Sequence, residues 1–282
     1  MRYIAVPTDF SDNAYNALLY ATRLFPNEAY TIVLVHSYEK EFSTSTSRID
    51  IGRNEDLVLD IEKRVSKNFE KLTHEIIRDT EGLQVSFETI MSGFPLFKCI
   101  SKLQGEKAIS LIVMGTKGAS GIQQFFMGSQ TMNLIKKTRK LPILVVPEKA
   151  DFIPPKVIAL ATDFKTPIYT HEINTLKEII QPNDAIIKIT HIYDQKSPEH
   201  VFEANYKKTK DSLSDLEYTT HWLANTSKKE KVLDEFVKKM GVDLLVLMYH
   251  KYSLLKKLFK ENIVENIGFH TTTPVLIFTD QD

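Results

Sequence analysis

Short, nearly continuous runs of apolar and β-branched residues alternate along the chain with longer segments of helical composition. In the first half, the runs predict strands at 3–6, 32–35, 85–90, 111–114 and 143–146. The segments between them predict helices at 13–25, 56–78, 96–104 and 129–139. Strands that are apolar throughout are typical of a sheet covered on both faces. Their alternation with helices indicates an α/β fold, in which right-handed crossovers join parallel strands.

The apolar pattern occurs twice in the same order. Residues 3–10 return as 157–164, and both copies end in Thr-Asp-Phe. Three further strands return, 31–36 as 185–192, 110–114 as 243–248 and 141–146 as 273–278. The repeat predicts two tandem domains, 1–149 and 155–282. The boundary falls where Pro154 and Pro155 can continue neither a helix nor a strand.

Composition narrows the class of protein. The chain has 282 residues, of which 43% are hydrophobic and 26% charged, as is typical of globular domains. Its 36 basic and 36 acidic side chains balance, so we expect no nucleic-acid partner and no binding to a membrane. No apolar run approaches the roughly 20 residues that cross a bilayer, and Pro7 interrupts the opening run too soon for a signal peptide. We therefore expect a cytoplasmic protein, and its single cysteine excludes an intramolecular disulfide framework.

Glycines gather directly after the predicted strand 111–114. Four of the chain's ten glycines lie at 115, 118, 121 and 128, and the last of them opens a predicted helix. Glycine allows backbone to approach a ligand closely, and the N–H groups at a helix start attract anions. The segment therefore predicts a phosphate cradle built largely of backbone, with Lys117 as a nearby counter-charge. A glycine-rich turn without a ligand is the alternative.

The spacing of Gly115, Gly118, Gly128 and Ser129 resembles the nucleotide motif of the ATP-binding branch of the universal stress protein family. The segments 7–11 and 140–146 also resemble that family, and the resemblance covers nearly the whole chain as two consecutive domains. It implies that each domain is an open five-stranded parallel sheet in the order 3-2-1-4-5, flanked by helices. It also implies that the last strands, 141–146 and 274–278, pair to form an internal pseudo-dimer; a homodimer of the whole chain stays open.

The resemblance implies a site for an adenine nucleotide between the first and fourth strands of the first domain. Asp9 would contact the adenosine, and Pro7 and Thr8 would shape its pocket. The backbone of Ser37 would recognise the adenine edge. Two residues, Met114 and Gly115, would line the ribose and α-phosphate. The phosphates would be held by the remaining residues, with Gln130 acting through its backbone: Lys117, Gly118, Gly128, Ser129, Gln130 and Thr131.

Each of these residues has a simpler interpretation. Asp9 could cap the helix that follows, and Ser129 and Thr131 could be helix-start residues only. We interpret His36 as a strand-end packing residue, because its counterpart His191 persists in the second half, which lacks the glycines.

In the second half, the residues opposite the glycines 115, 118 and 128 are Met248, Lys251 and Lys260 or Glu261. We therefore predict that the second domain does not bind ATP in the family manner. Four lysines of this segment could bind another anion or form a solvated helix face: Lys251, Lys256, Lys257 and Lys260.

The chain contains no Gly-Lys-Ser/Thr loop, no Gly-x-Gly fingerprint and no zinc-protease or esterase motif. We expect no catalytic residue and no metal ligand among its side chains, since nothing places a general base beside a nucleophile. The favoured function is a stress-response regulatory protein that binds ATP, or AMP or ADP, with or without Mg²⁺, and acts on an unidentified protein partner. A slow ATPase or nucleotidyl- or phosphotransferase, and a ligand-free interaction scaffold, stay open.

Overall fold

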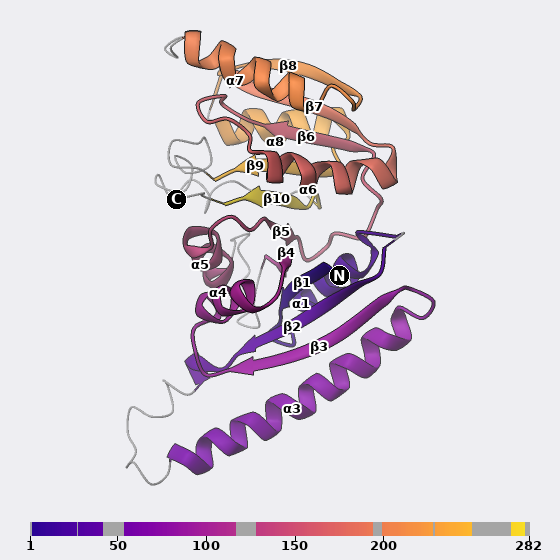
Figure 1. The fold of residues 1–282 in the computed structure, drawn as a ribbon, viewed down its shortest axis with the longest axis vertical. Helices are drawn as coiled ribbons and strands as arrows, with labels where there is room; N and C mark the ends of the chain where they lie inside the picture. The colour runs from indigo at the N-terminus through magenta and orange to yellow at the C-terminus, as the bar shows by residue number, and fades with distance from the viewer. Residues whose placement is uncertain are drawn as a thin grey trace.

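A computed structural model describes residues 2–26, 28–41, 54–116, 128–193, 199–227, 229–249 and 272–279. Its centre is one ten-stranded sheet in the order β3-β2-β1-β4-β5-β10-β9-β6-β7-β8, with helices on both faces (Figure 1). The strands of the first half are β1 (Arg2–Pro7), β2 (Tyr30–Ser37), β3 (Val85–Ser92), β4 (Ile109–Gly115) and β5 (Ile143–Val146). Its helices are α1 (Asp12–Arg23), α3 (Asn54–Asp79), α4 (Leu96–Glu106) and α5 (Ser129–Lys137).

The second half repeats this arrangement. Its strands are β6 (Val157–Ala161), β7 (Ile186–Tyr193), β8 (Tyr218–Ala224), β9 (Leu244–Met248) and β10 (Val275–Phe278). Its helices are α6 (Thr170–Ile180), the 3-10 turn η2 (Gln181–Asn183), α7 (Glu199–Ser212) and α8 (Lys229–Met240). All neighbouring strands within a half are parallel, and each half has the predicted order 3-2-1-4-5. The predicted fold class is confirmed.

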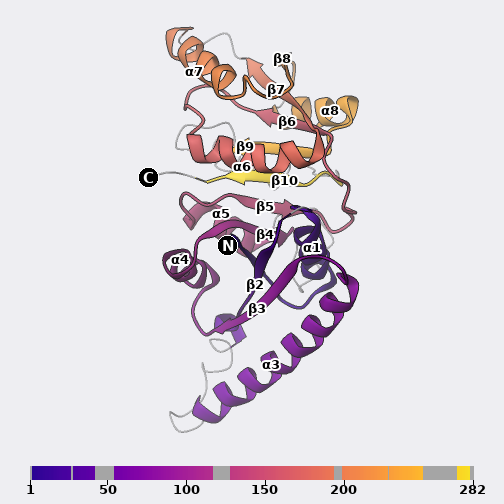
Figure 2. The ribbon, with the colours of Figure 1, turned by 45° about the vertical axis from the view of Figure 1, so that its right-hand side comes forward.

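The two halves join through their last strands, which lie side by side in the middle of the sheet (Figure 2). β5 and β10 are antiparallel, and Leu144 pairs with Leu276 at the centre of the contact. Beyond the strands, Thr279 Oγ1 donates to the carbonyl of Leu141 over 2.9 Å. The predicted pairing of the last strands is confirmed. Because this pair is antiparallel, the carboxyl ends of the first-half strands face away from those of the second half. The predicted boundary segment, 149–155, lies between β5 and β6.

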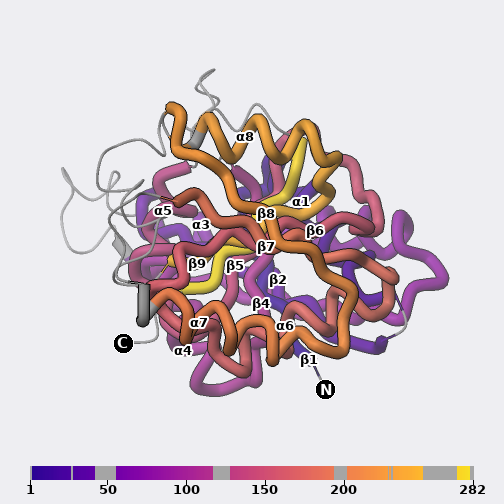
Figure 3. The backbone as a smooth tube through the Cα atoms, turned by 90° about the horizontal axis from the view of Figure 1, so that it is seen from above, coloured from indigo at the N-terminus to yellow at the C-terminus, as the bar shows by residue number. Residues whose placement is uncertain are grey.

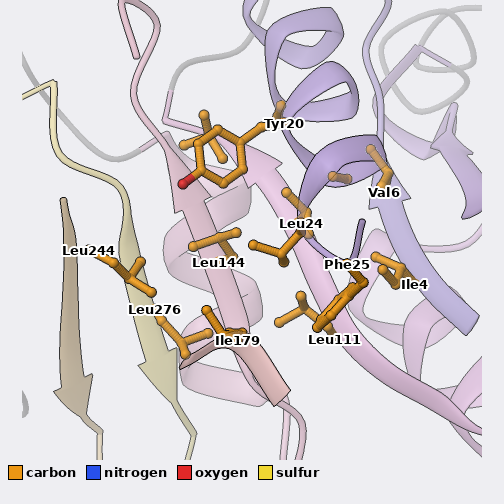
Figure 4. Close-up of a cluster of buried hydrophobic side chains, with 14 of the residues drawn as sticks. Ile4, Val6, Tyr20, Leu24, Phe25, Leu111, Leu144, Ile179, Leu244 and Leu276 are labelled. Carbon is orange, nitrogen blue, oxygen red and sulfur yellow. The ribbon is translucent and has the colours of Figure 1, made fainter. Parts of the chain in front are cut away.

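Apolar side chains from alternate strand positions point to opposite faces of the sheet, which explains the continuous apolar runs. On one face they pack with α1, α3, α6 and α7, and on the other with α4, α5 and α8. Seen from above, α8 lies on one side of the second-half strands, and α6 and α7 lie on the other (Figure 3). The first of these cores is continuous between the halves, since Leu144, Leu276 and Ile179 belong to one cluster (Figure 4). Among the described residues, no helix is long and apolar enough to cross a membrane.

Candidate functional site

The strand order reverses at β1, which has β2 on one side and β4 on the other. Open α/β sheets bind ligands beyond the carboxyl ends of their strands at such a point. The structure brings most of the predicted site residues to this edge. Three lie at the end of β1, one at the end of β2, two at the end of β4 and four at the start of α5: Pro7, Thr8, Asp9, Ser37, Met114, Gly115, Gly128, Ser129, Gln130 and Thr131. Lys117 and Gly118 lie outside the described residues, as do the lysines 251, 256, 257 and 260 of the second half.

A tight turn joins β1 to α1. Thr8 extends the β1–β2 ladder by donating its N–H to Val35 O over 2.9 Å, and its Oγ1 accepts from the N–H of Phe10 over 3.0 Å. Phe10 has a φ of 61°, in the left-handed region that non-glycine residues rarely adopt. The turn therefore reverses the chain within a few residues and leaves Thr8 and Asp9 at the edge of the sheet.

Asp9 supports the start of α1. Asp9 Oδ1 accepts two hydrogen bonds from Ser11, one from the N–H over 3.2 Å and one from the Oγ hydroxyl over 2.6 Å. Ser11 Oγ in turn accepts from the N–H of Ala14 over 3.3 Å and so caps the helix. The cap is therefore Ser11 itself, and Asp9 fixes the orientation of its hydroxyl.

His36 holds the same turn from β2. Its Nδ1 lies 2.8 Å from Thr8 O, and because a carbonyl only accepts, Nδ1 carries the hydrogen. The ring also packs against Phe10, with centroids 4.7 Å apart.

The second half repeats this turn closely. His191 Nδ1 lies 2.8 Å from Thr162 O, and Phe164 has a φ of 53°. This arrangement supports the strand-end structural role that the sequence predicts for both histidines.

Gly115 lies against a side chain that the sequence did not single out. A Cβ added at Gly115 would lie 2.8 Å from Cγ and Oδ1 of Asn13, which is 6% exposed on the first turn of α1. Any side chain at this position would displace Asn13, so the packing of α1 on β4 favours glycine whether or not a ligand binds. The only signal in the sequence was an asparagine at the start of the predicted helix 13–25.

The contact equivalent to that of Gly115 with Asn13 is different in the second half. Met248 pairs with Phe278 as Gly115 pairs with Val146, so it occupies the equivalent position. Its side chain is buried in the cluster that also contains Ile173 of α6. α1 begins at Asp12, whereas α6 begins only at Thr170, four residues later in the repeat. No helical turn therefore meets the Met248 side chain at the place where Asn13 meets Gly115.

The start of α5 lies beside the end of β4. Gly128 is the N-cap residue, with φ −54° and ψ 150°, and it has no side chain with which to cap the helix. Its N–H donates to Thr116 O over 2.5 Å, so the chain returns to the end of β4 at the point where it left. Thr131, 2% exposed, donates its hydroxyl to Gly115 O over 3.1 Å and ties the helix to the strand.

The first backbone hydrogen bond of α5 runs from Met132 N–H to Gly128 O. The N–H groups of 129–131 therefore have no acceptor within the helix and form the positive end of its dipole. Ser129 is exposed and Gln130 half-buried, so this end of α5 is open to solvent. Among the described residues, no group of three or more His, Cys, Asp and Glu is placed to hold a metal ion.

In the second half, the residue equivalent to Asp9 is Asp163, whose carboxylate has different hydrogen-bond partners. Burial raises the pKa of Asp163, although the Lys165 N–H bond and the Lys229 ammonium act in the opposite direction. The Asp163 side chain accepts from the backbone N–H of Lys165 over 3.1 Å, whereas the Asp9 side chain accepts from both the N–H and the hydroxyl of Ser11. The two turns therefore share a backbone conformation and differ in the hydrogen bonds that their aspartates accept.

Comparisons with known proteins agree with this architecture. The model of the universal stress protein family matches residues 1–147. The universal stress protein MJ0577 of Methanocaldococcus jannaschii is 26% identical over 156 residues, covering 52% of this chain and 94% of the relative. The crystal structure of a universal stress protein from Archaeoglobus fulgidus has a TM-score of 0.69 at 17% identity, over 98% of this chain and 96% of that one. PA1789 from Pseudomonas aeruginosa, described as functionally unknown, has a TM-score of 0.54 at 13% identity, over 100% of this chain and 94% of its own. The chain belongs to the universal stress protein family.

Proposed function

We propose that the first half binds ATP, or the related nucleotides ADP or AMP, at the carboxyl edge of β1 and β4. The observation that carries the proposal is the start of α5, which opens at Gly128 without a side-chain cap, beside the end of β4 and next to the reversal of strand order. A helix start in this position is a ready anion site, because its N–H groups and dipole both favour negative charge.

The other residues divide between the two ends of such a ligand. Pro7, Thr8 and Asp9 would contact the adenosine, and the backbone of Ser37 would contact the adenine edge. Met114 and Gly115, between these and α5, would line the ribose and the α-phosphate.

The N–H groups of Ser129, Gln130 and Thr131 would meet the phosphates. The hydroxyl of Thr131 already donates to Gly115 O, so its N–H is the group it offers to a phosphate. Lys117 and Gly118 enter this proposal through the sequence motif alone. Mg²⁺, where it accompanies the nucleotide, would bind the phosphate oxygens.

A regulatory role in a stress response fits a nucleotide site in a member of this family. In this proposal, a protein partner binds the surface around the start of α5 with a different affinity when the nucleotide is bound. Chromatography of the nucleotide after long incubation separates this role from the enzymatic alternative. Recovery of intact ATP supports a binding protein, whereas steady conversion to ADP favours a slow ATPase.

The test is a charge placed at the helix start. Gly128 has φ and ψ values that any residue adopts at an N-cap, so Gly128→Asp would cap α5 and set a carboxylate where the phosphates would lie. Gly128→Asn is the matched neutral control. Unfolding temperature is measured for each protein with and without millimolar ATP.

A ligand at a hundred times its Kd stabilises the folded state by about 2.7 kcal/mol. We expect ATP to raise the unfolding temperature of the wild type and of Gly128→Asn by several degrees, and that of Gly128→Asp not at all. Without ATP, Gly128→Asp should unfold at or slightly above the wild-type temperature. An equal ATP response in both variants, or no response in the wild type, would contradict the proposal.

A further inference from the structure

Phe94 is the most exposed large hydrophobic side chain of the described residues, at 66%. It stands between β3 and α4, in the sequence Gly93-Phe94-Pro95. A phenylalanine left in solvent forfeits the hydrophobic gain of burial, and a ligand that covers the ring would recover that gain.

The backbone that carries this ring is tightly held. The N–H of Phe94 donates to Ser92 Oγ over 3.1 Å. Its carbonyl accepts from Ser37 Oγ over 2.7 Å and from Cys99 Sγ over 3.5 Å. A Cβ at the preceding Gly93 would lie 3.2 Å from the ring of Tyr38, so the turn packs closely on the residue that follows β2. The exposed ring therefore projects from a fixed turn.

The bond to Ser37 places Phe94 at one particular end of the proposed site. Ser37 pairs with Ser92 at the carboxyl ends of β2 and β3, and β2 lies between β3 and β1. The phosphate end, at β4 and α5, lies on the other side of β1. Phe94 thus stands beside the residue whose backbone would meet the adenine edge, away from the helix start that would hold phosphate.

We propose that the ring of Phe94 stacks on the adenine base of the bound nucleotide. This inference rests on the proposed function and adds to it the residue that selects for a base. Stacking needs a flat aromatic face that is accessible before the ligand arrives, and a ring on a fixed backbone loses little freedom when it stacks. The base would then meet the backbone of Ser37 with its edge and the ring of Phe94 with its face.

The experiment compares ATP with inorganic tripolyphosphate, which has the phosphates without the base. Calorimetric titration measures both ligands with the wild type, Phe94→Ala and Phe94→Trp. Ile77→Ala is the control. Ile77 is 53% exposed near the end of α3, which leads into the amino end of β3, away from the carboxyl ends where the site is proposed. We expect Phe94→Ala to weaken ATP by about 5- to 150-fold, Phe94→Trp and Ile77→Ala to retain it, and tripolyphosphate affinity to be equal in all four proteins.

The outcomes separate the two proposals. If the wild type binds ATP and Phe94→Ala binds it equally well, the stacking proposal is wrong and the nucleotide site stands; Phe94 then serves another partner, such as a protein. If Phe94→Ala weakens tripolyphosphate as much as ATP, the effect is a general disturbance of the site and the stacking proposal is again wrong. If the wild type binds neither ligand, both proposals fail.

A fluorescence measurement reads the contact directly. Trp222 is the only tryptophan of the chain, so Trp222→Phe removes the native signal and Phe94→Trp in that background puts the sole tryptophan at the stacking position. Saturating ATP should quench its emission, whereas saturating tripolyphosphate should leave it unchanged. Emission that is unaffected by bound ATP would overturn the proposal.

Discussion

At the scale of single residues, Gly115 combines two constraints on one backbone position. Its missing side chain lets Asn13 pack against β4, and its carbonyl accepts the hydroxyl of Thr131. The glycine is thus explained by neighbours within the chain before any ligand is considered. The sequence predicted a close approach of something to this backbone, but spacing alone could not distinguish a phosphate from a neighbouring helix.

The first prediction concerns this contact. Gly115→Ala should lower the free energy of unfolding by about 1–3 kcal/mol, because the new Cβ would overlap the short, buried side chain of Asn13. Asn13→Gly in the same protein should recover part of the loss, and urea unfolding of both single variants and the double variant measures the coupling. Additive losses would show that the two residues do not compete for the same space.

The second prediction concerns the half-buried carboxylate of Asp163. Because burial raises its pKa, the folded state holds this proton more tightly than the unfolded chain. The contribution of this group to stability is therefore fully present below the unfolded pKa of about 3.9 and is lost as pH rises through the folded pKa. Asp163→Asn keeps an acceptor for the Lys165 N–H and removes the charge, so it should unfold at a higher temperature than the wild type at pH 7. A lower unfolding temperature at pH 7 would show that the charged form is the stabilised one.

At the scale of elements, the apolar pattern predicted the strands well because both faces of the sheet are buried. The predicted strand 143–146 matches β5, and the predicted helix 56–78 lies within α3. The late start of α6 was not predicted, since the sequence match between the halves ends at Phe164 and Phe10. Helix starts depend on caps: Ser11 caps α1, whereas α6 begins after Tyr169, whose N–H donates to Glu172 Oε2 over 2.9 Å.

The third prediction concerns the junction of α5 with β4. Thr131→Val should cost about 1–3 kcal/mol of stability, because it leaves the buried Gly115 carbonyl without the hydroxyl that donates to it. Thr131→Ser keeps the hydroxyl and is the matched control. Amide exchange of the first turn of α5 should speed up in the valine variant only. Equal exchange in both variants would mean that this bond does not anchor the helix.

At the scale of the whole molecule, the two halves share a sheet and a core. The antiparallel pair of β5 and β10 joins them, and Arg2 adds an ion pair to Glu178 of α6 over 2.9 Å. The repeat in the sequence predicted this tandem form. The glycine spacing predicts a nucleotide site in the first half, which stays a prediction, and Phe94 was not singled out, because a hydrophobic residue in a sequence is expected inside.

The fourth prediction follows from the shared core. Both halves should unfold in a single calorimetric transition, since the cluster of Leu144, Leu276 and Ile179 spans the junction. Leu276→Ala should cost about 2–5 kcal/mol and move that transition as a whole to a lower temperature. Two separate transitions in the wild type, or a shift of the second half alone, would show that the halves are thermodynamically independent.

The most direct measurement of the central claim is the number of ATP molecules bound per chain, by titration calorimetry on the wild type and on Gly128→Asp. An anion site at the start of α5 in the first half predicts one ATP per wild-type chain and none for Gly128→Asp. Two ATP per chain, or one ATP retained by Gly128→Asp, would contradict it.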